Sequence, residues 1–367
     1  MNRTVGRRML AALLALAAVA AVAPAADAKP KKRGKANDST VTVMTRNLYL
    51  GTDLIKIATA PDIDAFKAAV AAGFAEVKAT NFPARSKLIA KEVKQTKPDL
   101  IGLQEAALWR TGPSDGSASP NATKVAYDYV KLLVRALKRQ GMKYKVVRAT
   151  NEADIEGPSS EGYDVRLTMR DAILVRADRK GLKVRKKGGA NFTARIPFPT
   201  VGGVFDVRRG YAWADVKLGR KAFRFVDTHL EAYLESTRVA QAEELVARGG
   251  PVKGKRVIVL GDMNSDPKGE GGSPPSAYDA LIAGGLRDVW PAVNKRDPGY
   301  ACCLRTTTLT DPPRPLPWDH RIDQIFVKGK VKPVNAKTTG TNPRTSRTKG
   351  GLWASDHGGV VAKLRLR

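Results

Sequence analysis

Short apolar runs recur along the chain, and polar side chains follow many of them directly. The run 257–260 (Val-Ile-Val-Leu) contains three β-branched residues and is followed by Gly261, Asp262 and Asn264. A short β-branched run bounded by glycine favours a buried strand. If the backbone stays extended beyond Gly261, side chains two residues apart point the same way, so Asp262 and Asn264 leave the strand together. Taken alone, the stretch is more typical of a strand that ends in an ordinary Asx turn.

The same pattern predicts further strands with polar ends. We expect strands at 40–44, 100–103, 144–148, 167–175, 182–187, 211–218, 223–226, 321–327 and 360–366. Polar residues stand where several of these strands begin or end, namely Asn47, Glu105, His229, Asp323, Asp356 and His357. Polar side chains at strand ends are typical of a site at one edge of a sheet.

Apolar residues at helical spacing predict helices between these strands. We expect helices in parts of 54–77 and at 85–95, 122–139, 236–247 and 278–283, with a polar loop at 151–162. Alternating strands and helices predict an α/β layer fold. No internal repeat or clean linker interrupts the chain after residue 40, so we expect one domain over residues 40–367.

The N-terminus has the features of a secretion signal. A positively charged start, an apolar run and an Ala-x-Ala site at 26–28 predict a signal peptide over residues 1–28. Arg7-Arg8 is compatible with twin-arginine export as well as with ordinary secretion. Residues 29–39 have the composition of a basic linker. We therefore expect a secreted, extracellular protein.

The chain is strongly basic. Its 367 residues include 64 Lys and Arg against 35 Asp and Glu, a net charge of +29. Such a charge bears on partners and solubility rather than on fold. Nucleic acid is the first candidate partner, because neutralising phosphates releases counterions. Anionic lipid is the second candidate, and a merely solvated basic surface is the third interpretation. We expect a monomer without an obligate protein partner.

The two cysteines of the sequence, Cys302 and Cys303, are neighbours. Export permits a disulfide, but neighbouring Cα atoms lie about 3.8 Å apart across a trans peptide, which is below the usual range for a disulfide. A strained vicinal disulfide and two free thiols therefore stay open as alternatives. Neither suggests a fold built on disulfides or a zinc site.

The polar strand ends carry residue types suited to phosphoester hydrolysis. Mg²⁺ prefers carboxylate oxygens together with waters and phosphate oxygens, and Glu105 and Asp356 are candidate ligands. Hydrolysis also needs a group that orients or deprotonates a water, a task that suits a histidine held by a carboxylate. Of the three histidines, His229 and His357 stand at predicted strand boundaries, whereas His320 is expected in a loop or rim.

Six segments in this order resemble the motifs of the endonuclease/exonuclease/phosphatase superfamily, which includes deoxyribonucleases, sphingomyelinases and inositol-polyphosphate phosphatases. They are Thr45-Arg46-Asn47-Leu48, Leu103-Gln104-Glu105, Thr228-His229-Leu230, Gly261-Asp262-Met263-Asn264, Arg321-Ile322-Asp323 and Ser355-Asp356-His357. The resemblance extends over about residues 41–361. It implies an α/β fold, a four-layer αββα sandwich of two mixed β-sheets flanked by helices.

The resemblance also implies a metal site and phosphate contacts. Glu105 would bind Mg²⁺, Mn²⁺ or Ca²⁺, with Asn47 and Asp356 nearby. Arg170 lies on a strand where deoxyribonuclease-like relatives carry a basic residue, so it either contacts phosphate or faces the surface. Tyr163 is comparable to a family tyrosine near the phosphate, although a structural role is favoured. Whether one metal or two bind stays open.

For catalysis, the resemblance implies that His357, oriented by Asp323, deprotonates the attacking water or polarises the phosphate. His229 would contact the scissile phosphate. Asp262 and Asn264 would position the nucleophile and stabilise the transition state. Which of Asp262 and His357 takes the proton stays open.

We therefore predict a secreted, divalent-metal-dependent phosphodiesterase that acts on nucleic acid. The basic run 328–349 precedes Asp356 and is expected to border the site. Arg208-Arg209 and the basic run 183–187 are expected to add phosphate contacts unless they are merely solvated. The alternative is a phosphodiesterase or phosphatase of the sphingomyelinase or inositol-phosphate type, for which the apolar stretch 196–205 would touch a membrane unless it packs on the core. A non-enzymatic polyanion-binding protein is a third hypothesis, which the complete set of motif residues disfavours.

Overall fold

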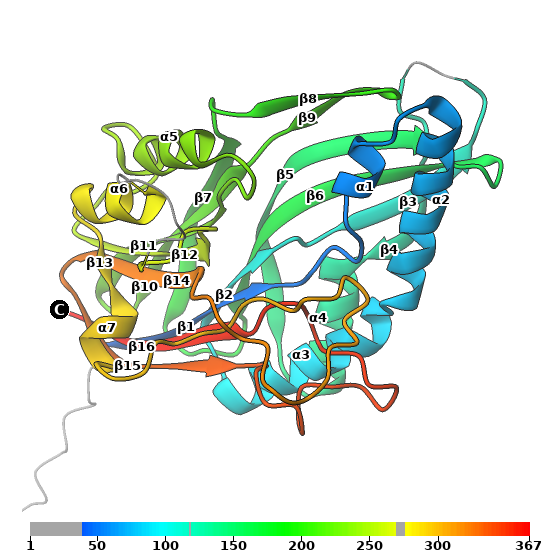
Figure 1. Cartoon of the computed structure of the whole chain (residues 1–367). Coiled ribbons are helices and arrows are strands. Elements are labelled where there is room, and N and C mark those ends of the chain that lie inside the picture. The colour runs from blue at the N-terminus through cyan, green and yellow to red at the C-terminus, as the bar shows by residue number, and fades with distance from the viewer. Residues whose placement is uncertain (1–38, 117–118, 269–275) are drawn as a thin grey trace, which may run out of the picture. The chain divides into compact units, whose positions relative to one another are not determined.

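Two mixed β-sheets lie at the centre of the protein (Figure 1), whose computed structural model describes residues 39–116, 119–268 and 276–367. The eight-stranded sheet has the order β15 (Val331–Thr339), β16 (Gly359–Leu366), β1 (Thr40–Asn47), β2 (Leu100–Gln104), β6 (Tyr163–Arg176), β3 (Leu108–Pro113) and β4 (Lys124–Asp128), with β5 (Tyr144–Pro158) also paired to β6. The six-stranded sheet has the order β13 (Arg287–Asp288), β14 (Asp323–Gly329), β12 (Arg256–Asp262), β11 (Lys221–His229), β10 (Gly210–Leu218) and β7 (Leu182–Asn191). A separate two-stranded ribbon consists of β8 (Ile196–Thr200) and β9 (Gly203–Val207).

Helices cover the outer faces of both sheets. The eight-stranded sheet packs against α2 (Ile63–Ala79), α3 (Phe82–Thr96) and α4 (Tyr129–Arg139). The six-stranded sheet packs against α5 (Glu235–Val246) and α6 (Ala277–Ala283). Two shorter helices are α1 (Ile55–Ala58) and α7 (Val289–Val293). The order helix, sheet, sheet, helix confirms the predicted four-layer αββα sandwich.

Alternating apolar side chains join the two sheets face to face. Val41 and Val43 of β1 belong to one buried cluster with Ile258 and Leu260 of β12. Met44, their neighbour on β1, belongs instead to the cluster beneath the helices. This is the period of two expected for a strand with both faces buried. It places the ends of β1 and β12 opposite each other.

The N-terminal predictions fall largely outside the structure. The predicted signal peptide (1–28) and all but the last residue of the predicted linker (29–39) lie outside the described residues. The remainder, Asp38–Arg367, forms one compact unit. In the described part of the chain, no helix combines the length and the apolar character needed to cross a membrane.

The helix expected over 122–139 is only partly correct. Residues 124–128 form β4, which pairs antiparallel with β3. The helix α4 begins at Tyr129, where the Asp128 side chain accepts the backbone N–H of Lys131. A strand partner and an N-terminal cap therefore set the boundary, rather than the apolar spacing.

Two other segments contain strands that the sequence did not predict. The expected loop at 151–162 is wrong, because β5 continues through it to Pro158 by pairing with β6. The basic run 328–349 contains the edge strand β15, which pairs with β16. In both segments, pairing with another strand overrides a polar local composition.

Candidate active site

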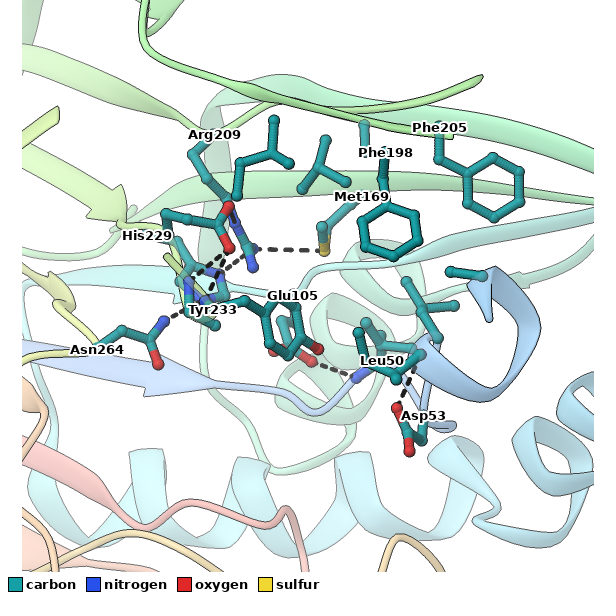
Figure 2. Close-up of a pocket in the computed structure, with 18 of the residues that line it drawn as sticks. Leu50, Asp53, Glu105, Met169, Phe198, Phe205, Arg209, His229, Tyr233 and Asn264 are labelled. Atoms are coloured by element: carbon teal, nitrogen blue, oxygen red, sulfur yellow. Dashed lines mark hydrogen bonds and ion pairs between the residues drawn. The ribbon is translucent and has the colours of Figure 1, made fainter. Parts of the chain in front are cut away.

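Four strand ends meet at one edge of the two sheets. β1 runs parallel to β2 in one sheet, and β11 runs parallel to β12 in the other, so each pair delivers its last residues to one edge. A cavity of about 480 Å³ lies there (Figure 2). Its lining includes six of the residues singled out by sequence: Glu105, His229, Asp262, Asn264, Asp356 and His357.

Asn47, at the end of β1, connects the two sheets at this edge. Its Nδ2 atom donates to Glu105 Oε1 over 3.2 Å and to Asp262 Oδ2 over 3.0 Å. A second polar link lies nearby, where Asp227 of β11 accepts from Gln104 Nε2 of β2 over 2.6 Å. These buried bonds hold the strand ends of the two sheets together.

The stretch that ends β12 turns sharply at the site. Gly261 is required, because a Cβ at this position would collide with the carbonyl oxygen of Thr228 on β11. Asn264 has a φ of 47°, and its N–H donates to Asp262 Oδ1 over 3.0 Å, so the Asx turn is present. The carboxylate of Asp262 thus closes the turn with one oxygen and contacts Asn47 with the other.

Two further residues of the site have positive φ angles. Tyr49 has a φ of 54° and Glu105 a φ of 51°, a region that residues with a side chain rarely adopt. Side chains of the site compensate for this conformation. Asn47 Oδ1 accepts the N–H of Tyr49 over 2.9 Å, and Glu105 Oε2 accepts the N–H of Leu50 over 2.7 Å. Backbone strain that is held in this way is typical of functional sites.

His357 is paired with the buried carboxylate of Asp323. Its Nδ1 atom lies 2.7 Å from Asp323 Oδ2, and its Nε2 atom lies 3.8 Å from Asp262 Oδ2. Burial by itself lowers the pKa of His357, but Asp323, Asp356 and Asp262 outweigh burial and raise the pKa well above its usual value. The imidazole is therefore protonated at neutral pH, with Nε2–H available as a donor.

His229 lies between two donors (Figure 2). Arg209 Nη1 is 3.0 Å from its Nδ1 atom, and Asn264 Nδ2 is 3.1 Å from its Nε2 atom. Burial and then Arg209 lower the pKa of His229 to about 3, so the ring is neutral. A neutral imidazole accepts at only one nitrogen. One of the two donors is therefore available to another oxygen.

Three of the carboxylates that line the cavity have pKa values shifted in different directions. Burial raises the pKa of Asp262, but His229, His357 and hydrogen-bond donors outweigh it and leave the pKa below its usual value. Burial raises the pKa of Glu105, and the nearby Asp356 raises it further. The pKa of Asp356 is also raised, again first by burial. Asp262 is therefore ionised, whereas the charge of Asp356 disfavours ionisation of Glu105, and these two carboxylates together fit an oxygen-ligated cation.

A second buried group also has ligand-type side chains. Glu152, Asp171 and His229 offer ligand atoms within 4.8 Å of one another. Burial raises the pKa of Glu152 to about 7, while Arg209 acts in the opposite direction. Because the guanidinium already lies against His229 and beside these carboxylates, this cluster fits a cation less well than the pair formed by Glu105 and Asp356.

Buried arginines fix the loops that carry the site. Arg85 Nη1 donates to the carbonyl oxygens of Leu48 over 2.7 Å and Ala354 over 3.0 Å, joining the segment after β1 to the segment before β16. Arg46 donates to the carbonyl oxygen of His357. Both arginines are fully buried. They satisfy backbone acceptors that irregular segments would otherwise leave unpaired.

The two tentative phosphate contacts do not join this group. Arg170 donates to the carbonyl oxygen of Ala106 and to Asp128, each over 2.8 Å, and does not line the cavity. It therefore supports the loop after Glu105, which differs from the expected phosphate contact. The hydroxyl of Tyr163 donates to Glu161 over 2.5 Å, away from the cavity lining.

The sequence suggested Arg209, together with Arg208, only as a further phosphate contact and not as a partner of His229. It directly precedes β10, whose Gly210 is the strand partner of His229. This register places the guanidinium against the histidine, and a periodic pattern in the sequence has no information about register. The signal that sequence did contain is an arginine immediately before a predicted strand.

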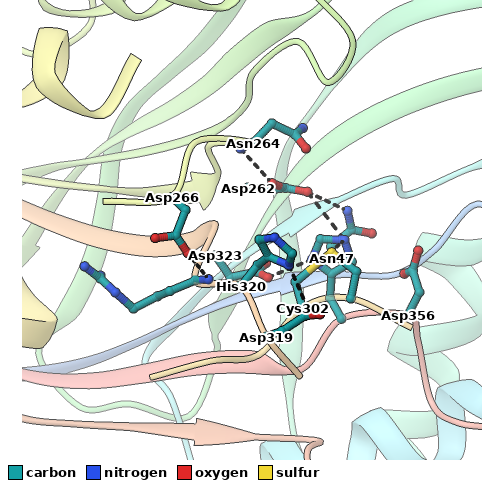
Figure 3. The surroundings of a disulfide bond; sticks show 12 residues. Asn47, Asp262, Asn264, Asp266, Cys302, Asp319, His320, Asp323 and Asp356 are labelled. Atoms are coloured by element: carbon teal, nitrogen blue, oxygen red, sulfur yellow. Dashed lines mark hydrogen bonds and ion pairs between the residues drawn. A yellow bond between two sulfur atoms is a disulfide. The ribbon is translucent and has the colours of Figure 1, made fainter. Parts of the chain in front are cut away.

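The cysteines form a vicinal disulfide next to the site (Figure 3). Cys302 Sγ lies 3.5 Å from His357 Nε2. The structure thus shows the first of the two alternatives that the sequence left open. His320 is partly exposed, and its backbone N–H donates to the carbonyl oxygen of Cys302 over 2.8 Å.

A family model and several solved structures are similar to this chain. The model of the Endonuclease/Exonuclease/phosphatase family matches residues 70–357. Among solved structures, a protein of this family from Bacteroides thetaiotaomicron has a TM-score of 0.55 at 18% identity, covering 89% of this chain and 98% of its own. A mannosyl-6-phosphatase from the same organism has a TM-score of 0.55 at 19% identity, covering 88% and 99%. A family protein from Beutenbergia cavernae has a TM-score of 0.51 at 22% identity, covering 89% and 72%.

No curated protein matches the sequence. At these identities the solved structures show a shared fold, which agrees with the four layers described above. The family match extends from α2 to the site residue His357, so it includes most of the strands and helices. On this match the chain belongs to the endonuclease/exonuclease/phosphatase family, as its motifs predicted.

Proposed function

We propose that this protein is a divalent-metal-dependent phosphodiester hydrolase. Its family supports phosphoester hydrolysis in general, and the metal and the diester are the finer part of the proposal. One observation carries it. An ionised Asp262, a protonated His357 and the two mutually repelling carboxylates of Glu105 and Asp356 all face one cavity.

Glu105 and Asp356 would hold the metal ion, with Asn47 beside them. Mg²⁺ and Mn²⁺ favour carboxylate and amide oxygens. A cation there would offset the burial that raises the pKa values of both carboxylates, and the charge of Asp356 that raises the pKa of Glu105 further. When bound, the ion supplies a Lewis acid that neutralises charge on the phosphate oxygens.

The protein side chains divide the remaining tasks. Asp262 accepts the proton of the attacking water, since its low pKa keeps it ionised and its Oδ2 atom lies 3.5 Å from Nε2 of His229 and 3.8 Å from Nε2 of His357. His357, held by Asp323, donates from Nε2 to a phosphate oxygen. The donor that His229 leaves free, from Asn264 or Arg209, binds a second phosphate oxygen.

Substrate class and location are further parts of the proposal. The net charge of +29 supports an anionic partner, with nucleic acid as the first hypothesis and lipid or inositol phosphates as the second. The signal peptide predicted at 1–28 supports secretion.

The test measures hydrolysis of bis(4-nitrophenyl) phosphate, supercoiled DNA and RNA with Mg²⁺, with Mn²⁺ and with EDTA. We expect His357→Ala to lower kcat/KM by roughly 100-fold or more. His320→Ala, a matched change outside the cavity lining, should alter it by less than about twofold. Hydrolysis that persists in EDTA would contradict the metal, and no turnover of any phosphodiester would favour the polyanion-binding hypothesis.

A metal titration tests whether Glu105 binds the metal ion. Glu105→Gln should raise the Mg²⁺ concentration needed for half-maximal activity by roughly 10-fold or more. Glu243→Gln, on the exposed face of α5, is the matched control. An unchanged titration would remove Glu105 from the metal site.

A further inference from the structure

The cavity has two halves of different chemistry. Figure 2 shows Glu105, His229 and Asn264 towards one end and Phe198 and Phe205 towards the other, with Met169 between them. The second half is apolar, and its lining comes from the ribbon β8–β9 and from the segment around α1: Ile196, Phe198, Phe205, Val207, Leu54 and Ile55. The total volume of about 480 Å³ suits a small organic ligand rather than a single phosphate.

The ribbon presents one apolar face to the cavity. Ile196 pairs with Val207 and Phe198 with Phe205, and all four line the cavity. Pro197 and Pro199, which alternate with these residues along β8, are exposed. The ribbon is fixed to the core through Phe205, whose ring centroid lies 6.0 Å from that of Phe66. A fixed apolar wall beside a phosphoester site selects for apolar groups next to phosphorus.

The charges that line the cavity disfavour a polynucleotide. Among the described lining residues, the carboxylates are Asp53, Glu105, Glu231, Asp262 and Asp356. The only Lys or Arg among them is Arg209, whose Nε atom is already 3.7 Å from Glu231 Oε2. Nucleic-acid backbones are held chiefly by cationic and other donor groups. This lining offers few of them.

The basic run 183–187, on β7, lies away from the site because of its strand register. Gly210 pairs with His229 on one side and with Asn191 of β7 on the other, so Asn191 marks the site edge of β7. Lys187 pairs with Ala214, four residues further along β10. At about 3.3 Å per residue, Lys187 lies roughly 13 Å from that edge. The rest of the run, back to Lys183, lies further still.

Exposed apolar side chains accompany the apolar half. Val201 and Val204, at the turn of the ribbon, are 46% and 66% exposed, and Tyr233 and Leu234, which line the cavity, are 64% and 47% exposed. Exposed apolar groups gathered around a ligand site suit contact with an apolar surface or chain. They extend the apolar character of the cavity to its outside.

We propose that the substrate is an amphiphilic phosphodiester, with phosphate at the Glu105 and His357 end and an aliphatic chain in the apolar half. This inference rests on the proposed hydrolase function and specifies its substrate. In the reaction, a water oxygen bonds to phosphorus, one P–O ester bond breaks, and the departing alcohol oxygen carries the proton away. No oxidant or reductant is required.

The test uses diesters of phosphate with glycerol on one side and a linear alkyl chain of two, four, six or eight carbons on the other. Products are quantified by mass spectrometry below the concentration at which these esters form micelles. For the unmodified protein with Mg²⁺, kcat/KM should rise by about threefold to fourfold per added methylene until the apolar half is filled. The thymidine dinucleotide is the polar comparison substrate and should be hydrolysed less efficiently than the octyl ester.

Substitutions in the ribbon β8–β9 test whether its apolar side chains cause the rise of kcat/KM with chain length. Phe198→Ser and, separately, Ile196→Ser should remove most of the chain-length dependence, so that kcat/KM for the octyl ester falls towards the value for the ethyl ester. Leu316→Ser, an exposed leucine outside the cavity lining, should keep the full dependence.

The outcomes separate the two proposals. If the esters are hydrolysed but kcat/KM does not depend on chain length, or if the dinucleotide is the better substrate, the apolar subsite is wrong and the hydrolase function stands. If neither the esters nor the dinucleotide are hydrolysed, the hydrolase function itself is contradicted and the substrate inference falls with it.

Discussion

The side-chain amide of Asn47 donates to Asp262 over 3.0 Å, joining residues that lie 215 positions apart and belong to different sheets. The same nitrogen contacts Glu105. One amide thus bridges Asp262, the proposed proton acceptor, and Glu105, a proposed metal ligand. Because an amide donates two hydrogens and carries no charge, it holds both carboxylates close without neutralising either.

Removing this amide should affect both activity and stability. In Asn47→Ala, Glu105 and Asp262 lose a shared donor, so we expect kcat/KM to fall roughly 10–100-fold and the free energy of unfolding to fall by about 1–3 kcal/mol. Urea denaturation and steady-state kinetics give the two values. Asn335→Ala, on the exposed edge strand β15, is the matched control. Unchanged kinetics in a folded Asn47→Ala protein would contradict a role for the bridge.

The pH dependence tests the pair formed by Asp323 and His357. After burial, which lowers the pKa of His357, Asp323 is the first of the carboxylates that raise it. Asp323→Asn should therefore lower that pKa. Since His357 acts in its protonated form, activity falls as the pH rises through this pKa, and the alkaline limb of kcat/KM should move to lower pH in the variant.

A similar pair on the surface provides the control for this profile. Asp319 Oδ1 lies 2.7 Å from His320 Nδ1, the same separation as in the buried pair, but both side chains are partly exposed. Asp319→Asn should leave the limb where it is. A limb that stays in place in Asp323→Asn would show that His357 does not act as the protonated donor.

The buried Glu152 should make stability depend on pH. Burial raises its pKa to about 7, whereas an unfolded glutamate titrates near about 4.3. Between these values the native state keeps a proton that the unfolded state has released, so the contribution of Glu152 to stability is lost as the pH rises through about 7. Glu152→Gln removes this titration and should gain up to about 3 kcal/mol relative to the unmodified protein between pH 4 and pH 8.

Urea unfolding at several pH values measures this difference. Glu243→Gln, on the exposed side of α5, carries the same chemical change without burial and should show no trend with pH. A difference between Glu152→Gln and the unmodified protein that is constant from pH 4 to pH 8 would mean that Glu152 is ionised throughout.

Arg85 should contribute strongly to stability, although it does not line the cavity. Its guanidinium donates to four backbone carbonyl oxygens, those of Leu48, Tyr49, Thr80 and Ala354. Arg85→Ala leaves these buried acceptors unpaired, and we expect a loss of about 3–5 kcal/mol in the free energy of unfolding. Arg135→Ala, on the exposed face of α4, should cost less than about 1 kcal/mol in the same denaturation experiment. If the two changes lowered the free energy of unfolding equally, the four hydrogen bonds of Arg85 would not stabilise the fold as proposed.

Much of the fold follows from local patterns. The continuous apolar run that predicted β12 reflects burial on both faces, and both β1 and β12 lie where the sequence places them. The order of the motifs predicted the family and the sandwich, and both are confirmed. The sequence also singled out the residues that the structure brings to one cavity, from Glu105 to His357, although their roles stay predictions.

Other features depend on partners far away in the sequence. The strand β5 extends over an expected loop because β6 lies beside it. Arg209 reaches His229 through the register of β10 and β11, and Arg170 turns to the backbone instead of the cavity.

Residues 257–264 show most clearly which features the sequence determines and which need the tertiary structure. Its own residues determine a buried strand, a glycine that permits close approach to β11, and an Asx turn. Only the tertiary structure brings Asn47 to the second oxygen of Asp262 and the ribbon β8–β9 to the other half of the cavity. The physical reason is the sequence separation over which each kind of interaction acts. Periodicity and turn chemistry act between residues a few positions apart, whereas the site and its apolar wall arise from side chains that meet only after the two sheets pack.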